Sequence, residues 1–98
     1  MSEINLDANK KLPTELWEAA EKGRATHIKE LLKTGADVNL VNNDGETALL
    51  VAACCGHTMA IDILLEAGAD VNHIDNQRNT ALTMAAWRGK HDTVKRLL

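Results

Sequence analysis

The sequence of 98 residues contains no Tyr or Phe and only two Trp, and no segment of it is dense in Lys or Arg. Proteins that bind nucleic acids or anionic membranes need clustered cations, and those that hold single strands also need aromatic side chains for stacking. This chain lacks both and has a net charge of −3. We therefore expect neither a nucleic acid nor a membrane as its partner.

Cysteine is also scarce, because only the adjacent Cys54 and Cys55 occur. One neighbouring pair cannot build a disulfide framework, which favours a reducing compartment. Residues 1–11 carry charges and lack the apolar stretch of a secretory signal. No apolar run approaches the roughly 20 residues that cross a bilayer. These features predict an intracellular, cytoplasmic protein.

One pattern recurs along the chain with a period of 33 residues. The segment Gly-Ala-Asp-Val-Asn at residues 35–39 returns at 68–72, and Thr-Ala-Leu at 47–49 returns at 80–82. A weaker copy begins near Thr14. Repetition in phase at such a period is typical of proteins built from stacked units. The resulting division is a leader or cap at 1–11 and repeats at 12–41, 42–74 and 75–98, the last of them incomplete.

Each unit predicts two short helices separated by a turn. Leu49, Ala52 and Ala53 lie on one helix face, and a second apolar stripe of Ile and Leu follows Gly56. Thr47 suits a helix N-cap. The first helices are rich in Ala and the second in Leu and Ile, so we expect a curved stack whose Ala-rich side is concave.

This pattern resembles the ankyrin-repeat family, whose period is about 33 residues and whose signature includes T-P-L-H-x-A. The resemblance implies an all-α solenoid of stacked helix-turn-helix units joined by β-hairpin-like loops. The chain departs from the signature at two positions. Glu15, Ala48 and Ala81 replace the Pro, and Trp17, Leu50 and Thr83 replace the His.

Arg78 stands where Gly45 stands one repeat earlier, at a loop position where the family usually has Gly. If this position needs a positive φ, an Arg there costs about 1–2 kcal/mol. We therefore predict that the loop containing Arg78 is distorted or looser than the loop containing Gly45.

The resemblance implies a non-enzymatic protein–protein interaction module that binds through loop tips and the exposed ends of the first helices. From the loops the candidate residues are Val41, Asn43, Asp44 and Glu46, then Ile74, Asn76, Gln77 and Asn79. From the helices they are Glu21 and Lys22, Cys54 and Cys55, and Trp87 and Arg88. Aromatic and Arg side chains are common anchors of protein interfaces. Alternatively, Trp87 packs on its neighbouring helix, and we expect Trp17 to lie in the core.

Two further interpretations remain open. Since the last repeat stops in mid-pattern, the chain is expected to be a fragment of a longer repeat array, or a regulatory or targeting segment of a larger enzyme. The same uncapped apolar end predicts a homodimer through the last helix, around Leu97 and Leu98.

The chemistry-bearing residues do not form a site of known type. Cys54, Cys55 and His57 lack the ligand spacing of structural zinc and the third group of a catalytic triad. We therefore expect no enzyme, no metal and no cofactor. Asn39 and Asn72 resemble the ankyrin asparagines that an oxygen-dependent dioxygenase hydroxylates, which makes both candidates for modification.

Overall fold

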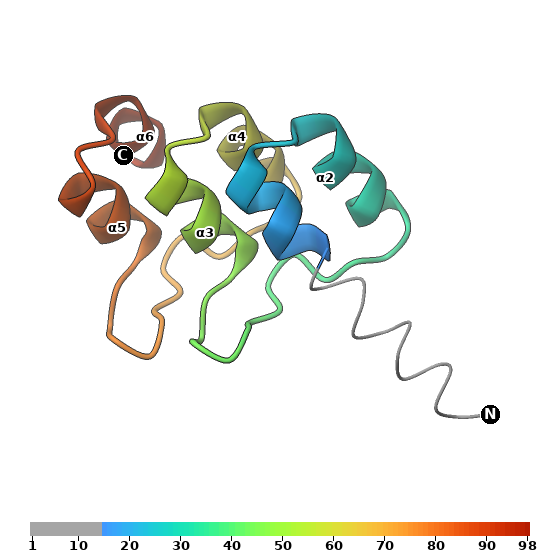
Figure 1. Cartoon of the computed structure of the whole chain (residues 1–98), viewed down its shortest axis with the longest axis horizontal. Coiled ribbons are helices and arrows are strands. Elements are labelled where there is room, and N and C mark those ends of the chain that lie inside the picture. The colour runs from blue at the N-terminus through green and yellow to red at the C-terminus, as the bar shows by residue number, and fades with distance from the viewer. Residues whose placement is uncertain (1–14) are drawn as a thin grey trace.

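The computed structural model describes residues 15–98, and the predicted leader at 1–11 lies outside this part of the chain (Figure 1). Residues 15–22 are helical. The helices that follow are α2 (Ala25–Lys33), α3 (Ala48–Cys55), α4 (Thr58–Glu66), α5 (Ala81–Trp87) and α6 (His91–Leu97). No strand occurs within 15–98.

The helices form three pairs that stack side by side (Figure 1). The first helices of the pairs, which we call the inner helices, are residues 15–22, α3 and α5, and the outer helices are α2, α4 and α6. Loops 34–47 and 67–80 both leave the stack on the same side (Figure 1). The predicted all-α solenoid of helix-turn-helix units is confirmed.

Threonine side chains cap the N-termini of two inner helices, α3 and α5. The backbone N–H of Leu50 donates to Oγ1 of Thr47 at 3.4 Å, so the predicted N-cap of α3 is confirmed. At α5 the N–H of Thr83 donates to Oγ1 of Thr80 at 3.2 Å, while the N–H of Thr80 donates to Oγ1 of Thr83 at 2.8 Å. This pair satisfies two backbone donors reciprocally. Thr83, which departs from the family signature, therefore has a capping role of its own.

The core combines many alanines of the inner helices, together with the larger Leu16, Leu49, Leu50 and Met84, with mostly branched side chains of the outer helices. The buried alanines of the inner helices are Ala19, Ala20, Ala48, Ala52, Ala53, Ala81 and Ala85. The outer helices contribute Ile28, Leu31, Ala60, Ile61 and Leu64. Because alanine has no side chain beyond Cβ, neighbouring inner helices approach closely, and α3 packs directly against α5.

The two long loops have the same backbone geometry, so the predicted distortion of the second loop is wrong. Arg78 has a φ of 68° and Gly45 has a φ of 76°. The N–H of Gly45 donates to the carbonyl of Asn42 at 2.9 Å, and the N–H of Arg78 donates to the carbonyl of Asp75 at 3.0 Å. Arg78 therefore occupies the left-handed region that favours glycine, and its loop keeps its shape.

The carboxylate of Asp75 explains why the loop does not relax. Its Oδ1 accepts the backbone N–H groups of Gln77 and Asn79, each at 2.8 Å. Burial raises the pKa of this carboxyl, but these donors outweigh it and hold the pKa below the usual value. Asn42 fills the equivalent position one repeat earlier with the same pair of bonds, each at 2.9 Å.

Replacing Arg78 with glycine is expected to raise the free energy of unfolding by about 0.5–1 kcal/mol, because relief of the positive φ exceeds the extra entropy of an unfolded glycine. Urea denaturation of the two proteins measures the difference. Arg78→Ala is the matched control, since it removes the charge but retains Cβ. An equal gain from Arg78→Ala would show that the side chain, and not the backbone, is the source of strain.

Candidate protein-binding surface

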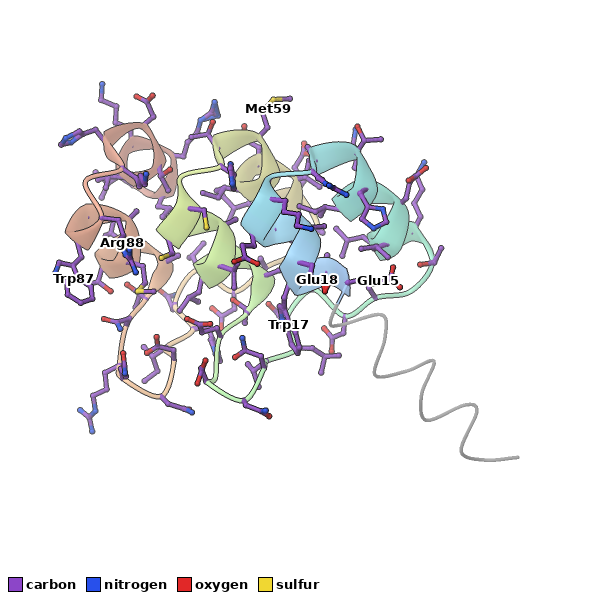
Figure 2. All side chains as sticks on the ribbon, in the orientation of Figure 1. Glu15, Trp17, Glu18, Met59, Trp87 and Arg88 are labelled. Carbon is purple, nitrogen blue, oxygen red and sulfur yellow. The ribbon has the colours of Figure 1, made fainter. Side chains whose placement is uncertain are left out.

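The predicted binding residues lie along the inner helices and the two loops, which together we call the hairpin–inner-helix surface. Its exposed loop residues are Val41, Asn43, Asp44, Ile74, Asn76 and Gln77, with Glu46 and Asn79 partly exposed. Its exposed helix-end residues are Glu21, Lys22, Trp87 and Arg88, with Cys54 and Cys55 partly exposed. The helix-end residues belong to the inner helices and the turns that follow them, as Figure 2 shows for Trp87 and Arg88, and the loop residues belong to the two loops that lead into α3 and α5.

Hydrogen bonds between the loops fix the two tips relative to each other. The backbone N–H of Asn76 donates to the carbonyl of Asp44 at 3.0 Å, and its side-chain amide donates to the carbonyl of Asn43 at 3.1 Å. A third bond joins Nε2 of His73 to the carbonyl of Gly45 at 2.8 Å. Because a carbonyl only accepts, the ring nitrogen carries the proton. The loop tips are therefore an ordered surface.

The asparagines considered for hydroxylation belong to the loop framework. Oδ1 of Asn39 accepts the N–H of Asp70 at 2.9 Å, and its amide nitrogen lies 3.4 Å from the carbonyl of Gly68. Asn72 is exposed, and its backbone N–H donates to Oδ1 of Asp70 at 2.9 Å. Asn39 thus ties one loop to the next, and hydroxylation at either asparagine stays a prediction.

Three of the predicted binding residues are apolar and exposed to solvent. Trp87 is 77% exposed, Ile74 52% and Val41 44%. The alternative that Trp87 packs on a neighbouring helix is therefore wrong, and Figure 2 shows its ring projecting from the end of α5 beside Arg88. Trp17 differs, because it is half-buried against the core and its indole N–H donates to the carbonyl of Leu40 at 3.3 Å.

Sequence reasoning missed three exposed apolar side chains, one of which is Val71, 40% exposed in loop 67–80. Leu40 is 41% exposed beside Trp17, and Met59 is 69% exposed on the outer helix α4. Met59 follows the N-terminal residue of α4, where the apolar pattern does not separate a solvent-facing position from a packed one. Whether such a position faces solvent or the core depends on the angle at which the helix packs in the stack.

The two cysteines are poor candidates for chemistry. Burial raises the pKa of the Cys55 thiol, with smaller contributions from Cys54 and Glu21, while Lys90 and Arg88 partly oppose the shift. The thiol therefore stays protonated at neutral pH and is a weak nucleophile. The ring of His57 faces the first repeat: its Nε2 donates to the carbonyl of Glu21 at 2.9 Å, and a Cβ on Gly23 would lie 2.5 Å from its Nδ1. Within residues 15–98 no three side chains gather as metal ligands.

Comparison with known proteins places the chain in a family. A family model described as ankyrin repeats, in three copies, matches residues 16–98. The chain therefore belongs to the ankyrin-repeat family, whose members are generally protein–protein interaction modules and typically lack enzymatic activity. Across residues 15–98, every helix is too short or too polar to traverse a bilayer.

A relative from Mus musculus, the inactive serine/threonine-protein kinase TEX14, is 44% identical over 46 residues. The matched segment is 47% of this chain and 3% of that protein. The similarity is confined to a small part of a much longer protein.

Proposed function

We propose that this chain is a non-enzymatic module that binds a partner protein through its hairpin–inner-helix surface. The observation that carries the proposal is Trp87, which is 77% exposed at the end of α5 and is followed by Arg88. Large aromatic side chains bury much area at little entropic cost, and Trp and Arg are enriched among residues that dominate binding energy. An exposed Trp beside an Arg is a favourable anchor for this reason.

The order of the surface supports the same proposal. The bonds from Asn76 and His73 hold the loop tips in place. A surface that is ordered before binding loses less conformational entropy when a partner docks. Val41 and Ile74 occupy equivalent positions on adjacent loops and present a second apolar contact.

The second candidate is a regulatory or targeting ankyrin segment of a larger enzyme or of a longer repeat array. The similarity to a short segment of a much longer protein, described as an inactive kinase, favours a place within a longer chain. The same surface would then bind either a separate protein or another part of its own chain. We place the module inside the cell, in the cytoplasm. A homodimer through the last helix, where Leu98 is 87% exposed, stays a prediction.

Capture of partners from a cell lysate, followed by mass spectrometry, tests the proposal. Trp87→Ala is expected to weaken capture of a specific partner by about 30-fold or more, the loss typical of a dominant interface residue. Met59→Ala is the matched control, because Met59 is also exposed and apolar but lies on the outer helix α4. Equal capture by the wild type and the Trp87→Ala variant would overturn the proposed surface.

A further inference from the structure

Charge is divided between the two edges of the stack. One edge holds the three turns within the helix pairs, at residues 21–25, 54–58 and 87–91, and we call it the turn edge. The opposite edge holds loops 34–47 and 67–80, at the other ends of the inner helices (Figure 1). The turn edge carries Lys22, Arg24, Arg88 and Lys90, two histidines and a single acid, Glu21. The loops carry Asp37, Asp44, Glu46, Asp70 and Asp75 against a single cation, Arg78.

Two of the turn-edge cations, Arg88 and Lys90, belong to the same turn as the exposed Trp87. Arg88 follows it directly and is itself exposed. The side chain of Lys90 lies across Gly56 of the preceding turn, so closely that a Cβ on that glycine would be 2.7 Å from Cδ of Lys90. Burial, and after it Cys54 and Glu21, raise the pKa of the Cys55 thiol, and Lys90 and Arg88 lower it. The turn-edge acid Glu21 therefore lies near the same thiol as the two cations. Both cations therefore reach the same end of α3 from the third repeat.

The distribution of charge limits what such a site attracts. Residues 42–74 contain five acids and no Lys or Arg, and none of these acids lies in the turn at residues 54–58. A nucleic acid strand carries a phosphate at every step and needs many cations along its path. A short acidic segment of a protein meets Arg88 and Lys90 without lying against the acidic loops. The observations thus favour an acidic peptide over a nucleic acid.

Building on the proposed function, we propose that the partner docks a short acidic segment containing a large apolar side chain at the turn edge of the third repeat. The apolar side chain packs on Trp87, and flanking carboxylates pair with Arg88 and Lys90. The planar guanidinium of Arg binds a carboxylate through two parallel hydrogen bonds, which gives direction as well as attraction.

The test uses the full chain and a blocked pentapeptide with four Glu residues around a central Leu, titrated at low salt and followed by NMR. Shifts are expected to centre on the Trp87 indole and on Arg88, and Arg88→Glu is expected to weaken binding by about 10-fold. Lys29→Glu is the matched control, because it makes the same change in net charge at an exposed position of the outer helix α2. This control is expected to leave the affinity unchanged.

Three results would overturn the proposal: equal binding of a peptide with Gln in place of Glu, an equal loss in Lys29→Glu, or tighter binding of a thymidine decanucleotide at the same residues. The last result would indicate a nucleic acid partner. The experiments distinguish a failure of the proposed protein-binding function from a failure of the proposed acidic partner segment. If Trp87-dependent capture of a protein succeeds while the acidic peptide fails to bind, the module remains and the partner class is wrong. If neither binds, both are wrong.

Discussion

Replacing Gly45 with alanine is expected to lower the free energy of unfolding by about 2–4 kcal/mol, because backbone strain and a steric clash add together. Gly45 has a φ of 76°, which side chains with a Cβ rarely adopt. A Cβ there would also lie 2.5 Å from Oδ1 of Asn76 and 3.0 Å from its backbone nitrogen. Since that nitrogen belongs to the backbone of the next loop, it yields only if the loops separate.

Gly68→Ala separates the two causes. Gly68 has a φ of 94°, and a Cβ added to it meets no atom within 4 Å. The substitution therefore strains the backbone without a clash, and the expected loss is about 1–2 kcal/mol. Urea denaturation of both variants gives the comparison. Equal losses would mean that the loops separate freely, which contradicts the interloop bonds from Asn76.

Arg78 shows where sequence reasoning about the fold reaches its limit. The period of 33 residues aligned Arg78 with Gly45 and located the strain correctly. The period did not show whether Arg78 would adopt a positive φ or whether the loop would change its shape instead. That outcome depends on the two N–H groups held by the Asp75 carboxylate, a local balance that the repeat pattern does not express.

Side chains that face a neighbouring repeat were the least predictable part of the structure. Arg96 and Asp62 form an ion pair at 2.6 Å between α6 and α4, although 34 residues separate them. This ion pair forms because the outer helices lie side by side. The period of 33 residues does not predict it, since positions 62 and 96 are not equivalent in the repeat. The exposure of Trp87 and the partial burial of Trp17 depend in the same way on which helix packs next.

The exposure of the candidate binding residues was easier to predict than these contacts, because loop tips and helix ends are exposed in any stack of such units, and their role in binding stays a prediction. The positions of Val41, Ile74 and Trp87 follow from the period once the helices are placed. The separation of charge between the turn edge and the loops depends on knowing which segments share an edge. The repeat pattern alone does not show which turns and loops lie together at one edge, so this separation of charge became visible only in the folded structure.

Leu64→Ala is expected to destabilise the chain by about 2–5 kcal/mol, which is a large share of the roughly 5–15 kcal/mol that stabilises a small protein. Leu64 is fully buried on α4, and α4 packs against both α2 and α6. Truncation therefore leaves a cavity lined on two sides by helices that are fixed by their own packing. Little collapse is possible there, which places the loss in the upper half of this range.

Leu97→Ala provides the comparison at the equivalent position of the next repeat. Leu97 is only partly buried on α6, so its removal exposes little new surface and the expected loss is about 1–2 kcal/mol. Both variants and the wild type are measured by chemical denaturation at the same series of protein concentrations. Self-association through the last helix would add to the stabilisation that the Leu97 side chain provides, and this contribution would depend on concentration. A loss at Leu97 that matches the loss at Leu64 and grows with protein concentration would show that Leu97 is buried in solution by a second copy.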